Sequence, residues 1–110
     1  MLKMHLDSEV FDLIKAGLKT VELRINDAKR QRLKISDEVC FLKRPDNMEQ
    51  LKVEVTGLQY FKDFEAAFSA YEVKALGYDT LDAIRQTIRG IYSVEEEKAL
   101  GVVGIGFEKL

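Results

Sequence analysis

The chain has 110 residues, of which 46% are hydrophobic and 33% are charged, and its formal net charge is -2. This composition is typical of an ordinary globular protein, and the length predicts one domain over residues 1–110 that buries its own core. No apolar run is long enough to span a bilayer and no secretory signal is visible, so we expect a cytoplasmic protein. One cysteine and one histidine exclude an internal disulfide and leave too few soft ligands for a zinc site.

The charge is unevenly distributed along the chain. Residues 15–34 carry seven basic and two acidic side chains, whereas residues 56–110 carry six basic and nine acidic ones. A basic lobe on a mildly acidic body can steer a phosphate-bearing ligand. A solvated surface loop gives the same pattern, so the charge alone favours nucleic acid only modestly.

The first elements are a strand over residues 1–6 and a helix that Asp7 or Ser8 can cap. The helix has a core stripe at helical spacing: Val10, Leu13 and Ile14. Gly17 stands where the helix needs a left-handed residue to end, and only glycine takes that conformation without steric cost. A strand therefore begins directly after it.

Residues 20–26 alternate between apolar and polar side chains, as a half-buried strand does. The apolar face holds Val21, Leu23 and Ile25, and the polar face holds Thr20, Glu22, Arg24 and Asn26. Glu22 and Arg24 lie about 7 Å apart along such a strand, and Lys19 stands at the junction with the helix. These three ionisable side chains are the best candidate for a site, and we expect them to face solvent.

The middle of the chain predicts further strands. We interpret residues 26–34 as a polar loop, residues 38–42 as a strand, and residues 43–47 as a turn. A third strand spans residues 50–56, where Gly57 ends or bulges it before an extended segment that reaches residue 61.

The second half predicts helices followed by a closing strand. Asp63 caps a short helix whose aromatic side chains belong to the core, and Thr80 caps a helix with one apolar stripe: Leu81, Ile84, Ile88 and Ile91. Ser93 and Glu96 form a capping-box pattern for a last short helix. The final strand, residues 102–107, contains two glycines, which suggests close backbone approach or a sharp bend.

Short strands around helical insertions favour an α+β fold, a small barrel of about five to six strands with flanking helices. A parallel βαβ fold is less compatible with the sequence, because no glycine-rich turn joins a strand to a helix.

Three stretches resemble one known family. Residues 17–24, GLKTVELR, resemble the G-x-K-x-x-E-x-R signature of the ASCH (activating signal cointegrator homology) domain, a branch of the PUA-like superfamily. Residues 33–41 and 92–107 resemble the family's turn-and-strand and closing-strand motifs. Ser36 stands where the family usually has glycine, so we expect that turn to adopt a conformation that serine tolerates.

The resemblance implies a PUA-like β-barrel with a cleft between the first helix and the motif strand, and a role in binding RNA or nucleotides. Some small bacterial relatives are amidohydrolases that act on N4-acetylcytidine, and ribonuclease activity has been attributed to others. The amidohydrolase lysine corresponds to Lys19, but its nucleophilic threonine corresponds to Glu22. Its glutamate corresponds to the stretch 75–78, which has no carboxylate, and Glu72 is only nearby.

For a binding protein, we expect Lys19 and Arg24 to take the anionic or carbonyl groups of a nucleotide and Glu22 to accept an exocyclic amine. Arg30 and Arg32, with the other basic side chains Lys29, Lys34, Lys43 and Arg44, would contact phosphates of single-stranded RNA. Tyr92 could stack on a base, although half-buried packing is the commoner role of such a tyrosine.

Other hypotheses remain open from sequence. The trio could be an internal ion pair that fixes the strand against the helix. Lys19 and Glu22 could be an acid/base pair of an amidohydrolase, or the acidic second half could bind a protein partner. No metal or cofactor is expected, and the sequence leaves the oligomeric state and the ligand open.

Overall fold

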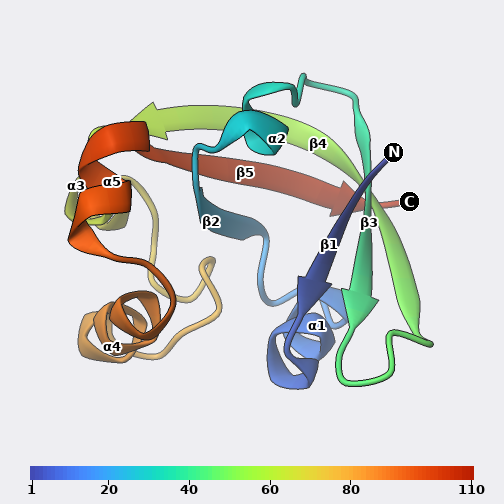
Figure 1. Ribbon diagram of the computed structural model, residues 1–110. Coiled ribbons are helices and arrows are strands. Elements are labelled where there is room, and N and C mark those ends of the chain that lie inside the picture. The colour runs from blue at the N-terminus through green and yellow to red at the C-terminus, as the bar shows by residue number, and fades with distance from the viewer.

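The computed structural model describes residues 1–110, and its five strands form one sheet that curls into a half-barrel (Figure 1). The strands are β1 (Leu2–Leu6), β2 (Val21–Ile25), β3 (Glu38–Lys43), β4 (Gln50–Phe61) and β5 (Val102–Lys109). Their order across the sheet is β1-β3-β4-β5-β2, in which only β1 and β3 are parallel. β1 and β2 are therefore the two edges, and the half-barrel is open between them.

Five helices flank this sheet, which confirms the predicted α+β architecture. They are α1 (Ser8–Lys15), α2 (Ala28–Gln31), α3 (Phe64–Ala70), α4 (Leu81–Ile91) and α5 (Val94–Leu100). α1 lies at the end of β1 and β3, whereas α3, α4 and α5 gather on the other side of the molecule (Figure 1). No helix combines the length and the apolar character needed to cross a bilayer.

The core consists of two hydrophobic clusters. The first lies between the sheet and α1: Met4, Leu6, Phe11, Ile14, Leu33, Val39, Phe41, Val53, Val55, Val103, Ile105 and Phe107. The second joins the apolar face of β2 to α3 and α4: Val21, Leu23, Ile25, Phe64, Ala67, Phe68, Leu76, Ile84, Ile88 and Val102. β2 thus packs its apolar face where the alternation predicted, and its polar side chains emerge between the two clusters.

Two glycines of the sheet, Gly57 on β4 and Gly104 on β5, have the predicted purpose. The register between β4 and β5 shifts between Val55 and Gly57, so Gly57 marks a bulge. A Cβ atom at Gly104 would lie 2.4 Å from the Tyr71 hydroxyl, so only glycine permits the ring to approach β5 there.

Local predictions were wrong at two places. The polar loop over residues 26–34 contains the single helical turn α2, because the Asp27 side chain accepts a hydrogen bond from the Arg30 N–H and caps it. Ser36 has φ +77°, a left-handed conformation that serine rarely adopts; its N–H donates to the Val55 carbonyl at 2.8 Å.

Candidate ligand-binding site

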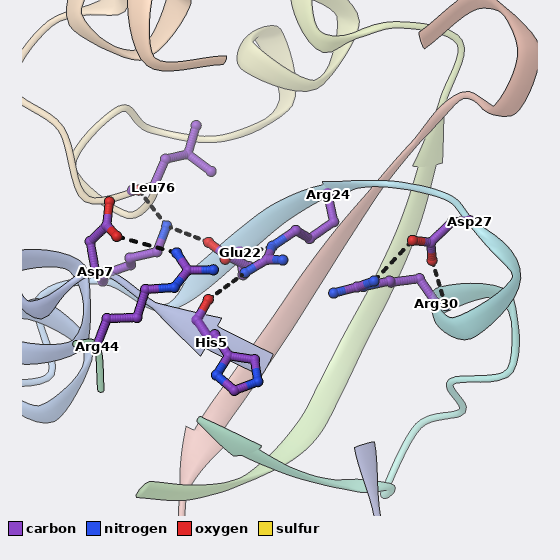
Figure 2. A network of polar contacts seen from close by, with 9 residues as sticks. His5, Asp7, Glu22, Arg24, Asp27, Arg30, Arg44 and Leu76 are labelled. Atoms are coloured by element: carbon purple, nitrogen blue, oxygen red, sulfur yellow. Dashed lines mark hydrogen bonds and ion pairs between the residues drawn. The ribbon is translucent and has the colours of Figure 1, made fainter. Parts of the chain in front are cut away.

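The three motif side chains meet around one carboxylate (Figure 2). Glu22 Oε1 lies 3.2 Å from Lys19 Nζ, and Glu22 Oε2 accepts a 2.9 Å hydrogen bond from Arg24 Nε. Lys19 Nζ also donates to the Leu76 carbonyl at 2.6 Å. The spacing predicted from the strand therefore brings the three groups together as an ion-paired network.

This network is buried, so our expectation of a polar face open to solvent was wrong. The side chains of Lys19, Glu22 and Arg24 are 4%, 10% and 19% exposed. The cause is remote in sequence: the segment before α4 lies against the start of β2, where the Thr20 and Val21 N–H groups both donate to the Ala75 carbonyl. A charged group buried this deeply needs partners, which the network supplies.

Mutual attraction keeps Glu22 and Arg24 ionised. Burial raises the pKa of the Glu22 carboxyl, but the charges of Lys19 and Arg24 and their hydrogen bonds outweigh it, so the pKa falls below its ordinary value. Burial lowers the pKa of the Arg24 guanidinium, and Glu22 more than restores it. At neutral pH the site presents a carboxylate between cations.

Gly77 makes room for the lysine of this network. It has φ +92°, and a Cβ atom there would lie 2.9 Å from Lys19 Cδ. The aliphatic part of Lys19 therefore runs directly against the Gly77 backbone on its way to the Leu76 carbonyl. The sequence indicated Gly77 only as a helix breaker.

The network borders a pocket of about 230 Å³ in the seam between the two hydrophobic clusters. A water molecule occupies about 30 Å³ of liquid, so the pocket has room for a small ring. Fourteen residues line it: His5, Leu6, Asp7, Val10, Lys19, Glu22, Leu23, Arg24, Arg44, Tyr78, Thr87, Ile88, Ile91 and Tyr92. We call the buried side chains of the network the floor of this pocket; the rest of the lining mixes aliphatic and aromatic side chains with polar and charged ones.

Arg24 also links the two edges of the half-barrel. Its Nη2 donates to the carbonyl oxygen of His5 on β1 over 3.4 Å, which is long for such a bond (Figure 2). The pocket therefore lies where the sheet is not closed by strand pairing.

Tyr92 lines the same pocket and also packs into the protein. Its ring stacks on Phe64 with centroids 5.5 Å apart and an interplanar angle of 22°. Burial raises the pKa of the Tyr92 phenol, and the charges of Arg24 and Arg30 act in the opposite direction. Tyr92 is therefore a half-buried packing residue, as expected for such a tyrosine, and it also contributes to the lining of the pocket.

The other predicted basic residues do not form one surface. The Arg30 side chain is only 13% exposed, and its Nη1 pairs with Asp27 at 2.9 Å (Figure 2). Arg32 and Lys29 line a separate, open hollow of about 670 Å³ beside α2. Arg44 instead reaches the pocket that holds the network, where its Nη1 lies 3.2 Å from Asp7 Oδ1.

Sequence reasoning missed four polar side chains of the pocket: His5, Asp7, Tyr78 and Thr87. They come from β1, from the residue before α1, from the segment before α4 and from α4 itself, so no local motif joins them. Burial raises the pKa of the Tyr78 phenol, which a hydrogen bond with Thr87 partly offsets. No group of three or more His, Cys, Asp or Glu side chains is arranged to hold a metal ion.

The sequence and the fold of this chain are similar to those of known proteins. No curated protein matches the chain significantly. Among solved structures, the crystal structure of the hypothetical protein PH0355 is 29% identical, with a TM-score of 0.83 over 99% of this chain and 98% of that one. The solution NMR structure of PF0455 from Pyrococcus furiosus is 28% identical, with a TM-score of 0.75 over 99% and 96%.

A more distant structure supports the fold alone. The crystal structure of ASCH from Zymomonas mobilis is 13% identical, with a TM-score of 0.67 over 96% of this chain and 65% of that one. The family model described as "ASCH domain" matches residues 4–110. Together with the G-x-K-x-x-E-x-R spacing of residues 17–24, this match shows that the chain belongs to the ASCH domain family.

Proposed function

We propose that the pocket binds a base of single-stranded RNA or of a nucleotide. The observation that carries this proposal is a buried, ionised carboxylate held between two cations on the wall of a pocket with room for a ring. A network that served only to fix β2 would need no hollow beside it.

The network has hydrogen-bonding capacity to spare. A carboxylate has about four lone-pair sites, and Lys19 and Arg24 engage one Glu22 oxygen each. A remaining site can accept an exocyclic amine, while free N–H groups of Lys19 and Arg24 donate to a neighbouring carbonyl. This pairing suits a base that presents an amine beside a carbonyl, as the edge of cytosine does.

The walls suit the faces of a base. Tyr78, Tyr92 and Ile88 supply aromatic and aliphatic surface around the charged floor, and stacking on aromatic side chains is the usual way to hold an unpaired base. A base reaches such a pocket only when it is splayed from its strand, so we expect preference for single-stranded over duplex RNA.

Phosphates of a longer RNA would contact the basic side chains beside α2. Lys29 and Arg32 make no ion pair and line their own open hollow. Arg30 is expected to contribute less, because Asp27 already holds its guanidinium. These contacts would be insensitive to sequence and sensitive to salt.

Affinity measurements with short single-stranded RNAs and Glu22→Gln test the proposal. The substitution keeps the shape of the side chain and removes the charge, so we expect affinity to fall about tenfold or more, because charge-assisted hydrogen bonds are about twice as strong as neutral ones. Arg85→Ala is the control, since it removes a cation of α4 that pairs with Glu65 and does not line the pocket. RNA binding that is absent, or unchanged in Glu22→Gln, would overturn the proposal.

An amidohydrolase that acts on an acylated nucleoside such as N4-acetylcytidine is the second candidate. Lys19 and Glu22 meet inside the pocket, as an acid/base pair requires. The lowered pKa makes the Glu22 carboxylate a weak base, so we favour binding without turnover. Incubation with N4-acetylcytidine decides between them, because release of cytidine would establish the enzyme. The same assay with RNA tests ribonuclease activity.

A further inference from the structure

The network at the floor of the pocket carries one positive charge too many. Lys19 and Arg24 are cations, Glu22 is the only acid that pairs with them, and all three side chains are at least four-fifths buried. Buried charges in proteins are normally compensated by partners of opposite sign. One negative charge is therefore missing on the inner side of this pocket.

The other charged pair of the pocket does not supply it. Asp7 is the only further acid among the lining residues, and its carboxylate already faces the Arg44 guanidinium at 3.2 Å. The lining residues thus contain three Lys or Arg cations and two carboxylates. The balance favours a ligand that brings one negative charge of its own.

Arg44 has a fixed backbone and an exposed side chain, so its guanidinium can turn toward a negatively charged ligand group. Its backbone N–H donates to the Leu6 carbonyl at 2.9 Å, which fixes the residue beside the end of β1. Its side chain is 54% exposed and its partner Asp7 is 76% exposed. Exposed ion pairs of this kind contribute little to stability, so exchange of Asp7 for another anion costs little.

Both arginines of the pocket have donors to spare. A guanidinium carries five N–H donors in a rigid fork. Arg24 uses its Nε for Glu22 and its Nη2 for the long bond to His5, and Arg44 uses only its Nη1. Arg24 comes from β2 and Arg44 from the turn that follows β3, both line the pocket, and Figure 2 draws both side chains near His5.

We propose that Arg24 and Arg44 together hold one phosphate group of the bound nucleotide, so that the pocket selects phosphorylated ligands over free nucleosides. The inference rests on the proposed function and narrows its substrate class. Arginine pairs suit this task because the fork of each guanidinium matches two phosphate oxygens. Asp7 holds Arg44 in place until the phosphate replaces it.

The role of Asp7 is visible in its position. It precedes α1 as the N-cap residue, yet its side chain makes no capping hydrogen bond and turns to Arg44 instead. Removing its charge should therefore free Arg44 for the ligand. We therefore expect the affinity for a phosphorylated ligand to rise when the Asp7 charge is removed. If the ion pair served only to position Arg44, this affinity would fall instead, because the Arg44 side chain would lose its defined position.

Calorimetric titration with cytidine, cytidine 5′-monophosphate and the trinucleotide CpCpC tests the proposal and separates a monoester from a diester. For the wild-type protein we expect at least tenfold tighter binding of one phosphorylated ligand than of cytidine. Arg44→Ala should remove most of that gain, so that the ratio of the affinities for the phosphorylated ligand and for cytidine falls toward one. Asp7→Asn should raise the affinity for the phosphorylated ligand severalfold, and Arg85→Ala should have no effect.

The outcomes separate the two proposals. Equal binding of cytidine and both phosphorylated ligands, or a phosphate preference that survives Arg44→Ala, would overturn the phosphate clamp and leave base binding in place. Binding of none of the three probes, together with no binding of the other three bases as nucleotides, would overturn both. The thermal midpoint of each variant checks that the fold is intact, and Arg44→Lys should restore only part of the gain, because lysine cannot engage two oxygens in a fork.

Discussion

Two buried glutamates of this chain stand in opposite situations. Glu97 on α5 is 5% exposed and receives hydrogen bonds from the Phe64 N–H at 2.6 Å and from Arg89 at 2.5 Å. One cation balances it, and it lines none of the larger pockets described above. Glu22 is balanced by two cations and borders a hollow.

The difference separates a structural carboxylate from a candidate binding group. Glu97 joins α3, α4 and α5, because its two oxygens hold the first turn of one helix and the last turn of another. Glu22 also holds neighbouring segments together through Lys19 and Arg24, but its single negative charge leaves one of these two positive charges uncompensated at the floor of the pocket. Burial of an ion pair is therefore weak evidence for a site, whereas excess charge beside a cavity is stronger evidence.

The largest effect on stability is expected at Glu97. Glu97→Ala leaves the buried Phe64 N–H without a hydrogen-bond acceptor and removes the ion-pair partner of Arg89, which is half-exposed. We therefore expect the free energy of unfolding to fall by about 2 to 3 kcal/mol. Urea unfolding measures it. Nucleotide affinity should not change in conditions where the variant stays folded, and a specific loss of binding would contradict the structural role of this carboxylate.

Gly77→Ala should damage both stability and binding. The new methyl group strains a residue at φ +92° and pushes against Lys19 Cδ, so we expect a loss of about 1 to 2 kcal/mol and a drop in nucleotide affinity of tenfold or more. Gly90→Ala is the matched control, because a Cβ atom at Gly90, within α4, would meet nothing within 4 Å. The control should be neutral or slightly stabilising. Unchanged binding in Gly77→Ala would show that the position of Lys19 is unimportant.

The pH dependence of stability should differ between wild type and Glu22→Gln. The folded pKa of Glu22 lies below its ordinary value of 4.5. The unfolded chain therefore binds the proton first, so the stabilisation by Glu22 is present above about pH 4.5 and is lost as the pH falls through the folded pKa. Thermal unfolding between pH 3 and pH 7 should show a smaller acid-induced loss in Glu22→Gln. Identical pH profiles would mean that the carboxylate is not held by its cations.

The smallest effect is expected at Ser36. Because this serine adopts φ +77°, Ser36→Gly should relieve backbone strain and raise the free energy of unfolding by about 0.5 to 1 kcal/mol. Chemical denaturation measures the gain, and binding in the pocket should be unaffected. A destabilised glycine variant would show that the flexibility added to the unfolded chain outweighs the strain.

The sequence predicted features that depend on neighbours along the chain. The capping box of Ser93 and Glu96, the bulge at Gly57 and the apolar face of β2 follow from local spacing, and all are present. The meeting of Lys19, Glu22 and Arg24 follows from the strand repeat in the same way.

The features that escaped prediction arise from distant segments. The network is buried because the segment around Ala75 lies against β2, and nothing in residues 19–24 reveals that cover. The pocket joins His5, Arg44 and Tyr78 from three separate parts of the chain. The helical turn of α2 has a local signal, the Asp27 cap, but it lies within a polar stretch whose composition favours a loop.

A titration followed by backbone amide NMR tests the central claim most directly. The wild-type protein is titrated with single-stranded RNA and with cytidine 5′-monophosphate, and shift changes are mapped onto the two glutamate regions. We expect the changes to concentrate around Glu22, Arg24 and Tyr92 and to leave Glu97 and Arg89 unmoved. Shifts that avoid the pocket, or equal shifts in both regions, would contradict the conclusion that the excess charge beside the cavity marks the binding site.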